Sequence, residues 1–593
     1  MLHLIIGRKN YGKTYRVYEQ IRALVKEGQK TFLLVPDQFS FESERQMLLL
    51  LGEKEAGKVD VCSFSRLAQT AVPSSGVRKL TDAGRVAFMS LALEELQGEL
   101  EVYGRFAGSI GVVAEMLKVS DELKQCAVTD EELIQASYKT DDAMLGKKLR
   151  DVARVIGAYD ALVAQSYFDE RDLLTRFAEQ LPEQGLFTDA VVFIDGFKGF
   201  TEQEMKVIAC MLEQGKEVYI TLCTDSVFGE EYDISPFSCV RSTAKRLMDT
   251  AKKCNVSVKS EKVEPYENRY AHDCLKALEQ RIYMPQTELF ELQANEITVC
   301  SASSAYDECD YVALSIKKLL RTEHYRCRDI AVIARNEGSY SKALRSAMKK
   351  QGIPVFEDKR RPLYAQPLAV LICSVLEIAA RGFSTDAVFR VLKTQLAGLS
   401  VEETGELEEY VYLWQIDGRK WLEEWKQNPS GLGCELRESD VKKLARLNAL
   451  RKRCVKPLEE FREKLHQADG SRMIAEIYHY LIAVSADKNL KIFAVALNEN
   501  GNEEEAVECG TVWDKMMELL DQMAMAISTA RVDAKRLLEL FRLVVSVQDI
   551  GVIPKGMDEV TIGSADRVRL NCPKVVFTVG VNEGVFPQNP SAG

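Results

Sequence analysis

The chain has 593 residues, of which 46% are hydrophobic and 28% charged, and its net charge is −11. This length is too great for a single hydrophobic core and predicts roughly three to five domains. No apolar run is long enough to span a bilayer, and the first residues do not form a signal peptide. We therefore expect a cytoplasmic protein with no membrane partner.

The first predicted elements form a strand–loop–helix–strand unit. Residues 2–6 are an apolar run that ends at Gly7 and predicts a buried strand. The apolar spacing over residues 17–25 predicts a helix, and residues 30–36 predict a second buried strand. This order is typical of a parallel sheet with helices on both faces.

The later sequence alternates between helical and sheet character. Helical spacing covers residues 80–185, and strands return at 190–197 and 217–223 with a helix between them. A second α/β set begins near residues 296–304 and includes a strand at 329–336. A long helical tract covers 366–545, and strands reappear at 559–564 and 574–581. The chain is therefore expected to hold two α/β cores, each interrupted by a helical insertion.

Cysteines and histidines argue against a metal centre built from these residue types in this segment. The 15 cysteines occur singly without any C-x-x-C pair, and the five histidines are far apart. Such spacing does not suit a disulfide framework, a zinc site or an iron–sulfur cluster. The negative net charge does not exclude nucleic-acid binding, because that depends on local patches.

The strongest local motif is a phosphate-binding loop near the N-terminus. The sequence GRKNYGKT fits the pattern GxxxxGK[ST] and lies between a predicted strand and a predicted helix. Lys13 would reach the β- and γ-phosphates, and the Thr14 hydroxyl would hold Mg²⁺. The alternative is a fortuitous turn. The predicted ATP-binding residues of this loop are Gly7, Arg8, Lys9, Asn10, Tyr11, Gly12, Lys13 and Thr14.

A second motif supplies an acid for the metal ion. The apolar strand in VVFIDGF ends at Asp195, where a protein of this kind holds Mg²⁺. Motor ATPases place a glutamate directly after that aspartate to activate the attacking water, but the next residue here is Gly196. Glu202 and Glu204 follow closely, and we interpret them as helix-start charges. The sequence thus predicts ATP binding without efficient hydrolysis.

Two further segments follow predicted strands and combine polar with aromatic residues. They are LVPDQFSFESE at 34–44 and VCSFSRLAQ at 61–69. Ligands bind at the carboxyl ends of parallel strands, and phenylalanine rings stack on nucleic-acid bases. The alternative is that Phe39, Phe41 and Phe64 belong to the core.

Three basic segments complete the candidate set. Arg335 follows the strand at 329–336 and would reach the γ-phosphate, or else form a surface ion pair. The run DKRRPL at 358–363 would contact backbone phosphate, although a solvated face is the ordinary interpretation. The segment IGSADRVR brings Ser564, Asp566, Arg567 and Arg569 after a strand.

Taken together, the motifs resemble one family along essentially the whole chain. In order, GRKNYGKT, LVPDQFSF, SFSRLA, FIDGFKGFTEQE, IAVIARN, IPVFEDKRRPL, IGSADRVR and VGVNEGVFP are similar to the AddB subunit of bacterial AddAB helicase–nucleases. The resemblance implies an α/β, superfamily 1 helicase-like fold with two RecA-like domains, 1A and 2A, and helical insertions 1B and 2B. On this chain the parts would be 1A at 1–80 and 186–290, 1B at 81–185, 2A at 291–365 and 546–593, and 2B at 366–545.

The resemblance also implies a role in DNA double-strand-break repair. AddA, the partner in a heterodimer, would supply the motor, while the AddB part binds DNA ends and scans the emerging single strand for the recombination hotspot Chi. The implied DNA-reading residues are Gln38, Ser40, Phe64, Arg66, Phe197 and Phe200. Family members often carry threonine where this chain has Ser40, and an aromatic residue where it has Gln69.

The resemblance implies further parts that this chain does not contain. AddB proteins are typically about twice as long, and their second half carries a nuclease domain with its metal and an iron–sulfur cluster. We expect this chain to bind ATP and Mg²⁺ but not to cut DNA. Three hypotheses follow: a DNA-reading module that holds ATP, an ATP-driven 3′–5′ translocase, or a scaffold with a vestigial loop. The missing carboxylate at Gly196 favours the first.

Overall fold

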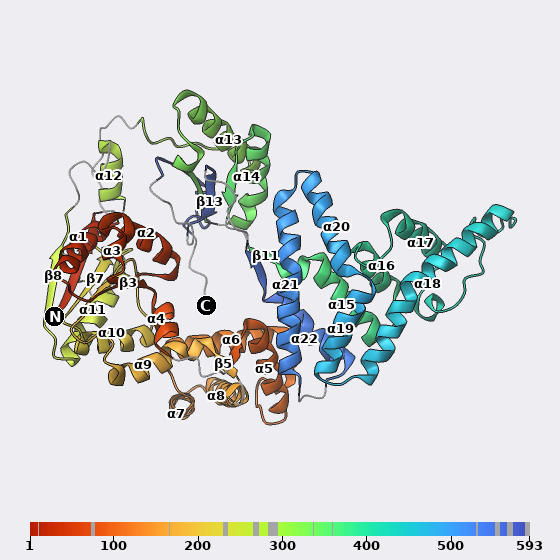
Figure 1. Ribbon diagram of the computed structural model, residues 1–593, viewed down its shortest axis with the longest axis horizontal. Helices are drawn as coiled ribbons and strands as arrows, with labels where there is room; N and C mark the ends of the chain where they lie inside the picture. The colour runs from red at the N-terminus through yellow and green to blue at the C-terminus, as the bar shows by residue number, and fades with distance from the viewer. Residues whose placement is uncertain are drawn as a thin grey trace. The chain divides into compact units, whose positions relative to one another are not determined.

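The computed structural model describes residues 1–9, 11–72, 78–164, 167–228, 235–264, 272–282, 295–335, 337–357, 360–528, 532–551, 558–565 and 573–587. The chain divides into two compact units, Met1–Ile297 and Thr298–Gly593 (Figure 1). Each unit contains a parallel sheet and a set of helices inserted into it. This arrangement confirms the predicted α/β class.

The first unit is built on a parallel sheet with the strand order β3-β2-β6-β7-β1-β8. Strand β7 therefore lies between β1, which leads into the phosphate-binding loop, and β6, which leads into Asp195. The strands are β1 (Leu2–Gly7), β2 (Thr31–Leu34), β3 (Val59–Cys62), β6 (Val191–Ile194), β7 (Glu217–Cys223) and β8 (Val258–Lys262).

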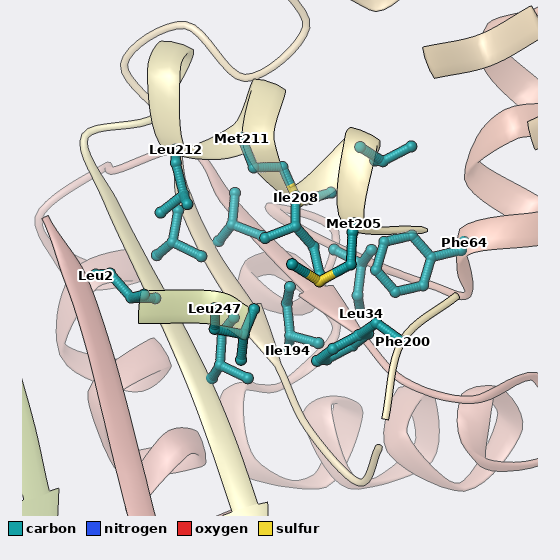
Figure 2. Close-up of a cluster of buried hydrophobic side chains, with 14 of the residues drawn as sticks. Leu2, Leu34, Phe64, Ile194, Phe200, Met205, Ile208, Met211, Leu212 and Leu247 are labelled. Atoms are coloured by element: carbon teal, nitrogen blue, oxygen red, sulfur yellow. The ribbon is translucent and has the colours of Figure 1, made fainter. Parts of the chain in front are cut away.

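Alternation along these strands gives the sheet two buried faces. Ile5, Leu33 and Phe193 face the helix α1 (Lys13–Lys26), which buries Val17 and Ile21 against them. The other face carries the larger core, in which Leu34 and Ile194 pack with the side chains of α10 (Glu202–Gln214) and α11 (Ser238–Lys253) (Figure 2). Asp195 has the same parity as Phe193 and so lies on the α1 side.

The remaining helices of the first unit flank the sheet or form its insertion. Helices α5 and α8 pack on each other between two short strands, β4 and β5, that pair in parallel. These elements are α2 (Ser40–Leu51), α3 (Glu53–Ala56), α4 (Phe64–Ala71), β4 (Arg78–Leu80), α5 (Asp82–Glu95), α6 (Ile110–Gln125), α7 (Asp130–Lys139), α8 (Ala143–Ala164), β5 (Tyr167–Asp169), α9 (Leu173–Gln184) and α12 (Asp273–Arg281).

The second unit has a parallel sheet with the order β10-β13-β9-β14. Helices α13 and α14 pack on each other and contribute to a core with β9, β13 and β14. These elements are α13 (Ala305–Thr322), β9 (Ile330–Ala334), α14 (Glu337–Gln351), β10 (Val355–Glu357), β13 (Val560–Ser564) and β14 (Val575–Val579).

The start of the second α/β set differs from its sequence pattern. Residues 296–304 have an apolar alternation typical of a strand, yet they form none, and Val299 is 93% exposed. A strand needs a neighbour to satisfy its backbone groups, and no described strand pairs with this segment. The first regular element of the second unit is therefore the helix α13.

A helical insertion interrupts the second sheet between β11 and β12, which pair antiparallel (Figure 1). Helix α15 is almost wholly apolar and packs on α16, α18 and α22. The elements are β11 (Arg360–Pro362), α15 (Pro367–Arg381), α16 (Thr385–Lys393), α17 (Val401–Trp414), α18 (Glu438–Gln467), α19 (Ser471–Ala483), α20 (Ala486–Glu499), α21 (Glu503–Ala526), α22 (Ala534–Ser546) and β12 (Asp549–Gly551).

Short 3₁₀ turns join several of these elements, at Asp37–Phe39, Gly104–Phe106, Glu170–Asp172, Cys327–Asp329, Leu363–Ala365 and Gly418–Trp421. Among the helices that the structure describes, none is both long and apolar enough to cross a bilayer. The described cysteines are all free thiols. The six-part division into 1A, 1B, 2A and 2B segments stays a prediction.

Candidate nucleotide and nucleic-acid site

The phosphate-binding loop joins the end of β1 to the start of α1. Gly12 is the N-cap of α1 and has a φ of 92°, in the left-handed region that glycine adopts without steric cost. The first turn of the helix leaves N–H groups without intrahelical partners, and it carries no acidic side chain. Such a helix end attracts phosphate. Asn10 lies outside the described residues.

Lys13 points back over the loop. Its Nζ donates hydrogen bonds to the carbonyl oxygens of Gly7 at 2.7 Å and of Arg8 at 2.8 Å. The ammonium group is therefore held beside the helix N-terminus, where a phosphate would be attracted to both.

The other loop side chains play different parts. The Arg8 guanidinium lies 5.5 Å from the centroid of the Phe237 ring and donates to the carbonyl oxygen of Glu279 at 3.2 Å. Arg8 therefore ties the loop to α12. Tyr11 is buried and Lys9 is exposed.

Asp195 meets the loop from β6. The Thr14 hydroxyl donates to its Oδ2 at 2.7 Å, and the Thr221 hydroxyl donates to its Oδ1. The carboxylate is buried, with 7% of its surface exposed. A hydroxyl and a carboxylate are the hard oxygen ligands that Mg²⁺ takes, usually with only one or two carboxylates and with phosphate and water completing the shell. The predicted pair Thr14 and Asp195 therefore fits Mg²⁺. In the described part of the chain there is no group of three or more His, Cys, Asp or Glu side chains that would hold a metal without a nucleotide.

The position after Asp195 does not suit a catalytic acid. Gly196 has a φ of 84°, and a Cβ there would lie 3.3 Å from a ring carbon of Phe39. Glu204 forms a capping box with Thr201, and burial raises the pKa of Glu204. Glu202 pairs with Arg246 at 2.6 Å. These contacts confirm the interpretation of both glutamates as helix-start residues.

The predicted polar DNA contacts lie just beyond the carboxyl ends of β2 and β3. Gln38 is exposed in the turn before α2, and Ser40 is half-buried as the first residue of that helix. Arg66 is exposed on α4 and pairs with Glu44 on α2 at 2.7 Å. Arg66 and Glu44 also line a groove of about 740 Å³ between α2, α4 and β3, which the sequence did not reveal because it depends on how these elements pack.

The three predicted aromatic contacts form one cluster. Phe64 and Phe200 are 3% and 6% exposed and belong to the larger core, where Figure 2 shows them among Leu34 and Met205. Phe197 is half-buried, and its ring centroid lies 5.4 Å from that of Phe64. The core placement that the sequence left open for Phe64 is thus observed, and base stacking by these rings stays a prediction. Phe41, by contrast, is 78% exposed.

Comparison with known proteins agrees with this site. The family profile described as "ADDB, N-terminal" matches residues 4–279, and "UvrD-like helicase C-terminal domain" matches residues 249–558. The chain belongs to the AddB family. The second match fits the superfamily 1 helicase-like fold expected from the resemblance.

AddB relatives match along nearly the whole chain. A protein of Acetivibrio thermocellus, named as the AddB-type subunit of an ATP-dependent helicase/deoxyribonuclease, is 30% identical over 99% of this chain and 52% of its own length. Proteins with the same name from Clostridium tetani and Caldanaerobacter subterraneus subsp. tengcongensis are 28% and 29% identical, each over 99% of this chain, with 53% and 52% of their own lengths covered. The chain thus spans about half the length of the curated relatives it matches.

The remaining candidates of the AddB resemblance lie in the second unit. Arg335 follows β9 and is half-buried, and its role toward a γ-phosphate stays a prediction. Ser564 ends β13. Residues 358 and 359 of the basic run, together with Asp566, Arg567 and Arg569, lie outside the described residues.

Proposed function

We propose that this chain is the helicase-like part of an AddB-type subunit in an ATP-dependent DNA helicase/deoxyribonuclease for double-strand-break repair. It binds ATP with Mg²⁺ and single-stranded DNA, and it reads the Chi hotspot rather than driving unwinding. Its partners are an AddA-type helicase–nuclease subunit and DNA ends. Family membership and the names of the relatives support this assignment.

The observation that carries the proposal is the joint position of Lys13, Thr14 and Asp195. The Lys13 ammonium and the N-terminus of α1 provide positive charge for a triphosphate. Thr14 and Asp195, in direct contact at 2.7 Å, provide oxygen ligands for Mg²⁺ beside it. Bound Mg²⁺ would neutralise charge on the β- and γ-phosphates.

Retention of ATP without turnover follows from the residue after Asp195. Hydrolysis needs a group that orients and activates the attacking water. Gly196 has no side chain, and the nearby Glu202 and Glu204 are engaged with Arg246 and with the N-cap of α10. The bound nucleotide then acts as a ligand that stabilises one arrangement of the protein.

DNA recognition would use the polar surface after β2 and β3. Exposed Gln38 and Arg66 provide hydrogen-bond donors of the kinds that read base edges. Phe197, half-buried over the core rings of Phe64 and Phe200, provides a supported aromatic edge. Since these groups follow neighbouring parallel strands, they form the ligand-binding edge expected for such a sheet.

Equilibrium binding tests the nucleotide part of the proposal. Calorimetric titration of the chain with ATP and MgCl₂ should give saturable binding that Lys13→Ala weakens by at least tenfold, because the ammonium–phosphate interaction is lost. Lys9→Ala, at an exposed position in the same loop, is the matched control and should bind within about twofold of the wild type. Absence of wild-type binding at millimolar ATP would instead support the vestigial loop.

A further inference from the structure

A buried threonine stands between the loop strand and the acid strand. Thr221 lies on β7, in register with Ile5 of β1, while the preceding Ile220 is in register with Ile194 of β6. Thr221 is therefore the lateral neighbour of Asp195. It is 3% exposed, on the sheet face that α1 covers.

The Thr221 hydroxyl is committed to two neighbours. It donates to Oδ1 of Asp195 and accepts a hydrogen bond from the N–H of Gly196 at 3.4 Å. An ionised carboxylate only accepts hydrogen bonds, and a hydroxyl has a single proton to donate. The proton of Thr221 is therefore directed at Asp195, and its lone pair faces the residue that replaces the catalytic acid.

The two oxygens of Asp195 have different neighbours as a result. Oδ1 faces Thr221 inside the sheet, and Oδ2 faces Thr14 at the start of α1. Thr14 belongs to the loop that a nucleotide would contact, whereas Thr221 belongs to a central strand of the sheet. A ligand can therefore displace the contact with Thr14 while leaving that with Thr221 intact.

We propose that Thr221 is a positioning residue for the Mg²⁺ site. By holding Oδ1, it fixes the rotation of the Asp195 carboxylate, so that Oδ2 stays directed toward Thr14 and the metal ion. This inference rests on the proposed nucleotide function and adds a residue that neither loop motif contains. Groups that hold a metal ligand in place typically contribute tenfold to a hundredfold to metal affinity.

A purely structural role for Thr221 makes a different expectation. Valine has nearly the same shape as threonine and suits a buried strand, so Thr221→Val should preserve the packing of β7. What it removes is the hydrogen bond to Asp195, which leaves one oxygen of a buried carboxylate without that donor. Thr221→Ser retains the hydroxyl and loses only a methyl group.

The experiment measures binding of a fluorescent ATP analogue in MgCl₂ and in EDTA. For Thr221→Val we expect about a tenfold loss of affinity in MgCl₂ and a change of less than about twofold in EDTA, with Thr221→Ser close to the wild type. Thr31→Val is the matched control. Thr31 is also a fully buried strand threonine of this sheet, but its hydroxyl donates to the carbonyl oxygen of Gln29 at 3.0 Å.

The outcomes separate this inference from the function on which it rests. Wild-type binding that depends on Mg²⁺ and survives Thr221→Val unchanged would overturn the positioning role alone. An equal loss in MgCl₂ and EDTA, or no recovery with Thr221→Ser, would also overturn it, because either result indicates general damage. A wild-type chain that binds no nucleotide, as Lys13→Ala is expected to do, would overturn the proposed function itself.

Discussion

At Gly196 the backbone itself opposes a catalytic side chain. Its φ of 84° lies in the region that costs other residues roughly 1–2 kcal/mol, and an added Cβ would approach the Phe39 ring at 3.3 Å. The acid therefore cannot be restored by supplying a carboxylate alone. The loss of hydrolysis is built into the conformation that follows Asp195.

The Gly196 conformation gives a direct prediction. Gly196→Glu should lower the free energy of unfolding by about 1–2 kcal/mol and should not produce ATP turnover. Gly199→Ala is the control, because its backbone is not left-handed and its Cβ would meet only Thr243 Oγ1 at 3.4 Å. Denaturant titration and a phosphate-release assay provide the two readouts. Rapid turnover by Gly196→Glu would contradict this view of the site.

Arg66 is the residue on which sequence reading by the proposed DNA surface most depends. In the complete complex, Arg66→Ala should reduce discrimination between a preferred oligonucleotide and a scrambled one by about 1–3 kcal/mol, with a smaller loss on the scrambled one. Arg45→Ala, which removes an exposed arginine paired with Glu42 on α2, should affect both equally. The preferred oligonucleotide would be found by selection from a random pool on the wild-type complex. Equal losses for Arg66→Ala would refute a reading role.

At the scale of elements, buried charges hold the first helical insertion together. Arg85 on α5 pairs with Asp121 on α6 and, at 3.1 Å, with Asp169 on β5. Asp169 also accepts a hydrogen bond from Tyr159 on α8 at 2.9 Å. Arg85 and Asp169 are almost completely buried, so the insertion depends on this network being complete.

Breaking the network should be costly. Arg85→Met leaves Asp169 buried without its main cation and should lower the free energy of unfolding by about 3–5 kcal/mol. Lys118→Met removes an exposed ion pair with Glu115 on α6 and should cost less than about 1 kcal/mol. Denaturant titration of both variants makes the comparison, and similar values would contradict the importance of burial.

The same network predicts how stability changes with acid. Burial alone would raise the pKa of Asp169, but the charges of Arg85 and Lys124 outweigh it and hold this pKa below its ordinary value. A pKa that is lower in the folded state stabilises the fold fully above the unfolded value of about 3.9 and loses this contribution as the pH falls below it. Asp169→Asn should therefore show a weaker decline in stability below about pH 4, which denaturant titrations across this pH range would measure.

Local patterns predicted most of the elements, since each follows from residues near one another. The loop between β1 and α1, the apolar strand before Asp195 and the long helices α17 and α18 all have such local signals. Contacts that depend on strand order had no signal. Thr221 reads as an ordinary strand residue, and only the position of β7 between β1 and β6 brings it beside Asp195.

The aromatic candidates illustrate a second limit of sequence patterns. Phe64 and Phe200 follow strands, as base-stacking residues would, but so do residues that cover the end of a core. The pattern cannot separate these cases because burial is decided by which rings pack together. Residues 296–304 show the same limit, since a strand pattern forms a strand only where a partner strand is available.

At the scale of the whole molecule, each unit combines a parallel sheet with a helical insertion. This is the superfamily 1 helicase-like fold, and the match to the UvrD-like helicase C-terminal domain agrees with it. A helicase-like fold supports motor action only where its site activates water, so fold alone does not decide between a motor and a DNA-reading module. The chemistry of the loop and of Gly196 decides it.

The most direct test follows bound ATP in a single turnover. The purified chain is mixed with ATP, MgCl₂ and saturating single-stranded DNA, and phosphate release is recorded beside Lys13→Ala. We expect the wild type to retain intact ATP, with turnover far below about 1 s⁻¹, the low end of typical enzyme rates, and Lys13→Ala to bind none. Turnover of about 1 s⁻¹ or more that disappears in Lys13→Ala would contradict the account.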